Sequence, residues 1–397
     1  NDTLIAGQKM SNRDVISKLK GKKGTEARVK VLRKGVKGLT EFRIVRDKIP
    51  IYSIDASYMV NRSTGYIRLS RFGVTSFKEF HEALVDLKLK GMSNLIVDLT
   101  GNGGGILSTS TDITDEFLSS GKLMVYTEGK NQPRMALKST SKGEFKSGKL
   151  VVLVDEGSAS ASEILSGAVQ DWDRGVIVGR RTFGKGLVQR QLPLTDGTMI
   201  RLTVARYYTP TGRGIQKPYN SGDLEAYDLD FMNRYNHGEM MNADSIHFPD
   251  SLKYATLVNK RTVYGGGGIM PDVFVPVDTT IGTSLHRQML AKGVINRITI
   301  QEVDNNRKQL LGTYPTIETF KNNYTISPAI IQKLKNNAQS EDIEWNEEEF
   351  EKSKKLILTQ LKALVARDLY DGAAFYRIIN DIDDIFSKGL EVISDDK

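Results

Sequence analysis

A run of alternating serine and alanine residues is the first candidate for chemistry in this chain. Residues 157–163 are Gly-Ser-Ala-Ser-Ala-Ser-Glu, and they follow the apolar stretch Val151–Val154 and open a helical pattern. Taken alone, such a segment is typical of a linker or a tight turn. Between a buried strand and a helix, however, a serine lies beside free backbone N–H groups and the positive end of the helix dipole. Such a place stabilises developing negative charge, so the segment also suits a nucleophile.

A serine nucleophile needs a base, and the histidines of this chain are poorly placed for that role. The chain has four of them, at positions 81, 237, 247 and 286. None is next to a glycine turn or a strand end. Lysine is the alternative base, although a lysine side chain must have its pKa lowered by roughly three units to act at neutral pH. Burial among apolar groups can lower it. Lys185 lies between Gly184 and Gly186 with apolar neighbours, so it is either this base or an ordinary surface lysine.

The segment Gly179–Lys185 also has the spacing of a phosphate-binding loop, G-x-x-x-x-G-K, after the apolar stretch Val176–Val178. Two features count against a nucleotide site. Gly186 stands where such a loop has the Ser or Thr that binds Mg²⁺. The residues that follow, Leu187–Leu194, have the pattern of a strand, whereas the loop must open a helix to direct its dipole at phosphate. A nucleotide-binding protein remains one alternative.

A glycine-rich turn is the third candidate. Gly101–Gly105 follows the apolar stretch Leu95–Leu99 and precedes a helical pattern. The turn is either a flexible connection or a source of free backbone N–H groups for an oxyanion.

Strands and helices alternate through residues 66–280, which carry all of these candidates. The expected strands are Tyr66–Leu69, Leu95–Leu99, Val151–Val154, Val176–Val178 and Val273–Val277. Helices are expected between them, at 76–90, 106–118 and 163–172. Asp196-Gly197 between Leu187–Leu194 and Met199–Tyr208 predicts a β-hairpin. This alternation indicates an α/β core.

The flanking segments differ from this core. Residues 1–47 predict a helix from Ser11 to Lys20 and two strands, which is too little to close a hydrophobic core. Residues 219–262 are polar and mixed in charge, so we expect a surface insertion. Residues 281–397 predict a region of amphipathic helices. The expected domains are therefore 1–47, 48–280 and 281–397.

Composition excludes several classes of protein. The absence of cysteine rules out thiol nucleophiles, disulfides and cysteine-based metal sites. The net charge of +8 is spread along the chain without an aromatic-interleaved basic stripe, so nucleic acid is not an expected partner. No run of eighteen apolar residues predicts a transmembrane helix.

Several segments in the same order resemble the C-terminal-processing, or tail-specific, peptidases of serine peptidase family S41. Residues 98–105, Asp-Leu-Thr-Gly-Asn-Gly-Gly-Gly, are similar to the family's D-L-R-x-N-P-G-G, and residues 152–164 are similar to its nucleophile segment. Thr182-Phe-Gly-Lys-Gly186, Tyr208-Thr-Pro-Thr-Gly-Arg-Gly-Ile-Gln216 and Gly268-Ile-Met-Pro-Asp272 are similar to later family signatures. The resemblance covers about residues 1–280.

The resemblance implies roles for three side chains. Ser160 would be the nucleophile, Lys185 the general base and Gln189 the residue that orients the lysine. Ser160 would attack a peptide carbonyl while Lys185 takes and returns the proton, and water would then hydrolyse the acyl-enzyme. The reaction would need no metal and no cofactor.

The resemblance also implies supporting groups. The oxyanion donors would be the backbone N–H groups of Ala161 and of a glycine near Gly104. Asp171 would be either structural or a support of the site. The chain departs from the family pattern at Thr100, where an arginine is usual, and at Gly103, where a proline is usual, which puts the local ion pairing in doubt.

The fold implied by the resemblance is an α/β core of the ClpP/crotonase type, with a partial PDZ domain at 1–47 and a helical C-terminal region. The expected activity is serine endopeptidase cleavage of proteins at or near their C-terminal tails, in the periplasm or cell envelope. The expected partners are substrates with accessible tails, and a homo-oligomer or an adaptor bound through 281–397. The alternative is a catalytically weak PDZ scaffold that binds envelope proteins.

Overall fold

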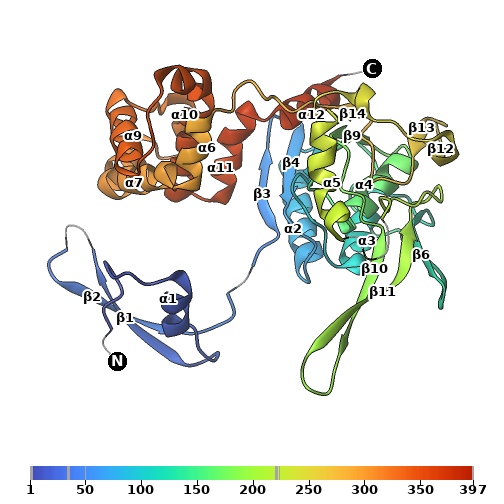
Figure 1. The fold of residues 1–397 in the computed structure, drawn as a ribbon, viewed down its shortest axis with the longest axis horizontal. Coiled ribbons are helices and arrows are strands. Elements are labelled where there is room, and N and C mark those ends of the chain that lie inside the picture. Colours follow the sequence, from blue (N-terminus) through green and yellow to red (C-terminus); the bar gives the residue numbers. More distant parts are fainter. Residues whose placement is uncertain (1–2, 34–35, 50, 220–221, 223, 396–397) are drawn as a thin grey trace. The chain divides into compact units, whose positions relative to one another are not determined.

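The chain forms two compact units, residues 1–52 and 53–397 (Figure 1). The structure is a computed structural model that describes residues 3–33, 36–49, 51–219, 222 and 224–395. The sequence suggested a further boundary after residue 280, but the structure joins the core and the C-terminal helices into one unit. Among the described residues, no helix combines the length and the apolar character needed to span a membrane.

The first unit contains the expected helix and strand pair. These are α1 (Asn12–Leu19), capped by the Ser11 side chain, and the antiparallel strands β1 (Glu26–Leu32) and β2 (Leu39–Val45). None of the described residues of this unit is buried. Its apolar side chains therefore have no core to enter within the unit, as the sequence predicted.

The second unit is built on a six-stranded sheet. In spatial order its strands are β14 (Val273–Phe274), β9 (Val176–Gly179), β8 (Leu150–Val154), β5 (Asn94–Asp98), β4 (Thr64–Leu69) and β3 (Ile54–Met59). Neighbouring strands are parallel, except that β3 runs antiparallel to β4. The sequence predicted all of these strands except β3. The mixed α/β architecture is confirmed.

Both faces of this sheet are covered. The helices α2 (Ser76–Leu89), α3 (Leu107–Asp115) and α4 (Ala161–Asp171) belong to the core on one face. On the other face, Val151 and Leu153 pack with Ile385 and Ile393 of the C-terminal region. Since both faces are buried, the strands are continuously apolar rather than alternating.

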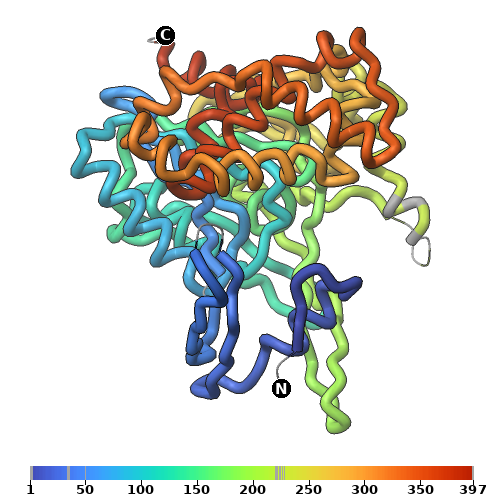
Figure 2. Tube along the Cα trace, turned by 90° about the vertical axis from the view of Figure 1, so that its left-hand side faces the viewer, coloured from blue at the N-terminus to red at the C-terminus, as the bar shows by residue number. Residues whose placement is uncertain are grey.

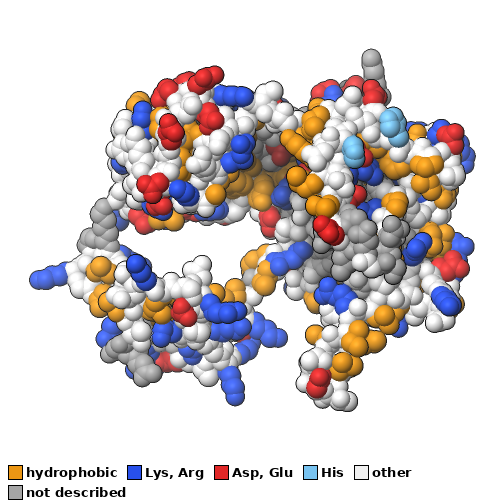
Figure 3. All heavy atoms as spheres, viewed as in Figure 1, with side chains coloured by type: hydrophobic (Ala, Val, Ile, Leu, Met, Phe, Trp, Pro, Cys, Tyr) orange, Lys and Arg blue, Asp and Glu red, His pale blue; other side chains and the backbone are white. Residues whose placement is uncertain are grey.

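A second, antiparallel sheet lies beside the core. Its order is β10 (Leu187–Pro193), β11 (Met199–Tyr208), β6 (Leu123–Gly129) and β7 (Gln132–Lys138). The predicted hairpin is the β10–β11 pair, and its tip extends away from the central sheet, in green in Figure 2. Apolar side chains such as Ile200 and Leu202 are exposed along it (Figure 3). The sequence did not predict β6 and β7.

The segment 219–262 is more integrated than the expected surface insertion. It contains α5 (Leu224–Asn236), η1 (Ala243–Ser245), η2 (Asp250–Leu252), β12 (Lys253–Ala255) and the start of β13 (Thr262–Tyr264). The Arg234 side chain, on α5, is buried and donates hydrogen bonds to the carbonyls of Arg181 and Thr182 in the core. The insertion therefore packs on the core and does not only cover its surface.

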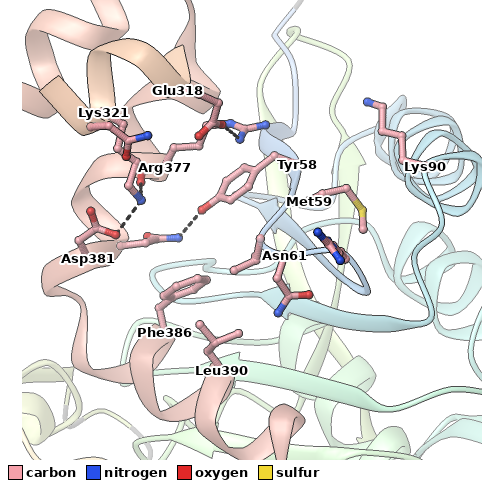
Figure 4. Close-up of a pocket in the computed structure, with 14 residues that line it drawn as sticks. Tyr58, Met59, Asn61, Lys90, Glu318, Lys321, Arg377, Asp381, Phe386 and Leu390 are labelled. Carbon is pink, nitrogen blue, oxygen red and sulfur yellow. Dashed lines mark hydrogen bonds and ion pairs between the residues drawn. The ribbon is translucent and has the colours of Figure 1, made fainter. Parts of the chain in front are cut away.

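The C-terminal region is helical, as predicted. Its elements are α6 (Ser284–Ala291), α7 (Val294–Thr313), α8 (Ile317–Asn323), α9 (Pro328–Ser340), α10 (Glu347–Leu369), α11 (Gly372–Ile379), η3 (Asn380–Ile382) and α12 (Asp384–Ser394). The earlier helices enclose cores of their own, whereas α12 packs on the sheet. A cavity of about 670 Å³ lies where Tyr58 of β3 approaches Arg377 and Phe386 (Figure 4).

Candidate active site

Ser160 is the residue from which α4 begins, immediately after the turn that follows β8. Its backbone has φ 57° and ψ −109°, a conformation that side-chain-bearing residues rarely adopt. A strained serine between a strand and a helix is the geometry that presents a nucleophile above a sheet. The Ser160 side chain is only partly buried, so it remains accessible to a substrate.

Glu163 is a buried carboxylate that the sequence analysis did not assign to the site. Its Oε2 accepts hydrogen bonds from the backbone N–H groups of Ser160, at 2.7 Å, and Lys185, at 2.9 Å. Its Oε1 accepts from the Thr182 hydroxyl, at 2.6 Å, and from Gly184 N–H, at 2.7 Å. Burial raises the pKa of Glu163, and these four hydrogen bonds oppose that rise. One carboxylate therefore joins the main chains of Ser160 and Lys185.

Tyr207 makes a second connection between the same two residues. This buried tyrosine lies on β11, and its hydroxyl is within hydrogen-bonding distance of the carbonyl oxygens of Ser160, at 3.0 Å, and Lys185. Burial raises the pKa of the Tyr207 hydroxyl well above its usual range, so it stays a neutral donor. The backbone N–H groups of Ser160 and Lys185 thus donate to Glu163, and their carbonyl oxygens accept from Tyr207.

The turn that carries Lys185 depends on its two glycines, as the sequence suggested. Gly184 has φ 87°, and a β-carbon there would lie 3.1 Å from the backbone of Gly268. Gly186 donates its N–H to the Gln216 side chain at 2.9 Å. The Lys185 side chain is half-buried rather than fully buried. Its ammonium makes no hydrogen bond or ion pair with any described residue.

Gln189 does not reach Lys185 in this structure. It lies on β10 directly after a register shift against β11, and its side chain is exposed. Within the described parts of the chain it forms no side-chain hydrogen bond. Its predicted role in orienting the lysine therefore stays a prediction.

The two predicted oxyanion donors differ in the structure. Gly104 packs directly against the nucleophile, because a β-carbon there would lie 2.8 Å from Ser160 Cβ and 2.8 Å from Ala161 N. Its own N–H, however, donates to Asn102 Oδ1 at 2.8 Å. The N–H of Ala161, in the first turn of α4, has no acceptor among the described residues. Gly104 therefore shapes the site by its lack of a side chain, and its N–H is not free to bind an oxyanion.

The glycine-rich turn is tied to the nucleophile segment by its backbone. Asn102 O accepts from Ala159 N–H at 2.9 Å and from the Ser162 hydroxyl at 2.8 Å. The Ser158 hydroxyl donates to Leu99 O at 2.8 Å. The flanking serines, Ser158 and Ser162, thus hold the turn.

Asp171 lies at the opposite end of α4 from Ser160. It is fully buried and forms an ion pair with Arg213, and it also accepts hydrogen bonds from the N–H and hydroxyl of Thr211. A helix of eleven residues places its ends about 15 Å apart. These contacts are a structural use of Asp171, and its support of the site stays a prediction.

The described residues contain no group of three or more His, Cys, Asp or Glu side chains that could hold a metal ion.

Comparisons with known proteins bear on the same segment. Residues 63–225 match the model of peptidase family S41, and residues 285–371 match a family of unknown function, DUF8443. A carboxyl-terminal-processing protease from Synechocystis sp. is 38% identical over 214 residues, which are 53% of this chain and 49% of the relative. The carboxy-terminal processing protease CtpB from Bacillus subtilis is 35% identical over 224 residues, 55% of this chain and 46% of the relative.

Among solved structures, a photosystem II D1 C-terminal processing protease matches with a TM-score of 0.40 and 26% identity, over 70% of this chain and 62% of that one. The chain spans about half the length of the curated relatives it matches. The matched segment contains the strained serine, the buried Glu163 and the glycine-flanked lysine. The segment that is similar to peptidase family S41 and to the carboxyl-terminal-processing proteases is thus the one that carries the candidate site.

Proposed function

We propose that this chain is a serine endopeptidase that cleaves proteins at or near their C-terminal tails through Ser160 and Lys185. One observation carries the proposal. Glu163 and Tyr207 each contact the main chains of both residues, so a strained serine and a glycine-flanked lysine are built into one site. The curated relatives, which are carboxyl-terminal-processing proteases by name, support the substrate class.

In the proposed reaction, Ser160 Oγ attacks a peptide carbonyl while neutral Lys185 accepts the hydroxyl proton. The carbonyl oxygen becomes an oxyanion, which Ala161 N–H stabilises at the positive end of α4. Lys185 then gives its proton to the leaving amine, and the acyl-enzyme forms. Water, deprotonated by Lys185, hydrolyses the ester and restores Ser160. A second oxyanion donor from the glycine turn requires Gly104 N–H to leave Asn102.

The finer architecture belongs to the same proposal. We infer a ClpP/crotonase-type core, supported by the sheet with helices on both faces. A partial PDZ domain at the N-terminus is supported by a helix and strand pair without a buried residue. A periplasmic or envelope location is supported by the sequence resemblance alone. The helices of 281–397 are proposed to hold a second copy or an adaptor.

The test is cleavage of casein, an unstructured substrate, by wild type, Ser160→Ala and Lys185→Ala across a range of pH. We expect both variants to lose at least about a thousandfold in rate, since nucleophile and base act as a unit. The wild-type rate should rise toward alkaline pH, because a lysine accepts a proton only when neutral. Lys90→Ala is the control variant, because Lys90 is exposed and directly follows the last residue of α2. It should keep wild-type activity.

Activity that survives in Ser160→Ala or Lys185→Ala would refute the assignment of these residues. A wild type that cleaves nothing but binds peptide tails would support the scaffold alternative. A rise in melting temperature with ATP and Mg²⁺ would instead support the nucleotide-binding alternative at Gly179–Lys185.

A further inference from the structure

A partly buried arginine holds the start of the glycine-rich turn. Arg68, on β4, directs Nη1 to Asp98 Oδ2 and to the Thr100 hydroxyl, the latter at 2.7 Å, and Nη2 to the Thr100 carbonyl at 3.0 Å. Asp98 Oδ1 in turn accepts from the Thr100 N–H at 2.8 Å and hydroxyl at 2.7 Å. Thr100 is therefore fixed from both sides. It is also the position where the resemblance leads one to expect an arginine.

The cluster lies between the sheet and the C-terminal region, with the Asp98 side chain 5% exposed and the Arg68 side chain 19% exposed. Tyr66 donates its hydroxyl to Asp98 Oδ2 at 2.5 Å, and both side chains are buried. The Arg68 guanidinium lies 4.9 Å from the centre of the Tyr376 ring, on α11. The Tyr376 hydroxyl donates to Asp55 Oδ2 at 3.3 Å. Because both side chains are largely covered, the ion pair of Arg68 and Asp98 is less screened by water than a surface pair.

Hydrogen bonds lead from this cluster to the nucleophile. The residue after Thr100, Gly101, donates to Asp155 Oδ1 at 2.8 Å. The next residue, Asn102, accepts from Ala159 N–H through its carbonyl and from Gly104 N–H through its side chain. Each contact sets the position of the turn against the segment that carries Ser160. A displacement of Thr100 therefore moves the wall of the candidate site.

We propose that Arg68 is a positioning residue for the active site, which holds the glycine-rich turn against Ser160 and is itself held in place by Tyr376 of the C-terminal region. The kinetic test of this inference rests on the proposed function. The test by amide hydrogen exchange does not depend on activity. The guanidinium of Arg68 thereby reaches Thr100, the position where the resemblance leads one to expect an arginine. The C-terminal helices thereby take part in shaping the site, although they contribute no reacting group.

The experiment compares the full chain with Arg68→Lys, Arg68→Met, Tyr376→Ala and Tyr376→Phe. Lysine keeps the charge but lacks the planar fork, so both Arg68 variants should speed amide hydrogen exchange in peptides covering 99–106 by about tenfold or more. With a peptide substrate, kcat should fall at least about tenfold while KM stays within about twofold, since the turn shapes the reacting geometry. Tyr376→Ala should act in the same direction, and Tyr376→Phe, which keeps the ring, should behave as wild type.

Arg62→Met is the matched control, because Arg62 is an exposed arginine near the same strand. It should change neither exchange nor kinetics. Unchanged exchange at 99–106 in the Arg68 variants, or faster exchange with an unaltered kcat, would overturn the proposal. If Arg68→Met does not fold, Arg68→Lys and Tyr376→Ala decide the question. A wild type that cleaves nothing would refute the proposed function, while exchange would still test Arg68. As a second check, Arg68→Thr combined with Thr100→Arg should restore slow exchange.

Discussion

The two halves of the candidate site are built differently. The nucleophile half lies in the interior of the molecule, where Ser158, Ser162 and Glu163 are buried and hydrogen-bonded. The base half lies on a turn that leads into the projecting β10–β11 hairpin, with Lys185 half-buried and Gln189 exposed. The backbone of Lys185 is fixed by Glu163 and Tyr207, but its side chain has no partner among the described residues. The serine is thus held before substrate arrives, whereas no hydrogen bond to a described residue fixes the lysine side chain.

This difference shows that the fold can position the serine separately from the step that activates the lysine as a base. A fixed backbone conformation at Ser160 is maintained by many buried contacts, which over-determine it. A lysine needs a dry environment to act as a base, and a bound substrate can supply that environment by covering it. The predictions below test this division, from the largest expected effect to the smallest.

Replacement of Glu163 by alanine should have the largest effect, because it leaves donors on both halves without an acceptor. Each unsatisfied buried donor costs roughly 1–3 kcal/mol, so we expect a loss of at least about 3 kcal/mol in the free energy of unfolding. Activity should disappear with it. Urea denaturation followed by circular dichroism measures the free energy of unfolding, and peptide cleavage measures the activity. Glu163→Gln, which keeps one acceptor oxygen, should lose less stability, and equal losses would contradict this account.

The pH dependence of stability gives a second measure of the same carboxylate. Since burial raises the pKa of Glu163 in the folded protein, this group favours folding most below its pKa in the unfolded chain, about 4.3. That contribution is lost as the pH rises through the raised pKa. The wild type should therefore lose stability relative to Glu163→Gln over this interval. A difference in unfolding free energy that does not change with pH would argue that the hydrogen bonds fully offset burial.

Tyr207→Phe should have an intermediate effect, since it removes one hydroxyl and leaves the ring packing intact. We expect a loss of about 1–2 kcal/mol in stability. We also expect kcat to fall about tenfold, because the carbonyls of Ser160 and Lys185 lose their common donor. Thermal unfolding measures the loss of stability, and steady-state kinetics measures kcat. A stability loss with an unchanged kcat would show that Tyr207 stabilises the core but does not align Ser160 with Lys185.

Gln189→Ala should have the smallest effect on stability, within about 0.5 kcal/mol, because the side chain is exposed. If Gln189 orients Lys185 once substrate is bound, kcat should nevertheless fall by up to about tenfold with KM nearly constant. The exposed neighbour Arg190 serves as control through Arg190→Ala. Identical kinetics for both variants and the wild type would remove Gln189 from the mechanism.

Local patterns in the sequence predicted the strands of the central sheet except β3, the Asp196-Gly197 hairpin and the glycine-flanked lysine. The same patterns could have indicated Glu163, because Ser160 and Glu163 have the spacing of a capping box. Tyr207 gave no local signal, since its partners are 47 and 22 residues away in the chain. The pairing of Gly104 N–H with Asn102 was also hidden, because a glycine pattern shows where a backbone can bend but not where its N–H points. Arg68 contacts Thr100 from a neighbouring strand, a contact that only the fold reveals.

The cover that α12 provides for the sheet has a consequence for biosynthesis. Val151 and Leu153, which precede the nucleophile, pack against Ile385 and Ile393, which the ribosome adds much later. Domains generally fold as units during synthesis. Here the nascent chain holds Ser160 long before the last layer of its supporting sheet exists. The fold therefore delays a complete catalytic core until α12 has been synthesised.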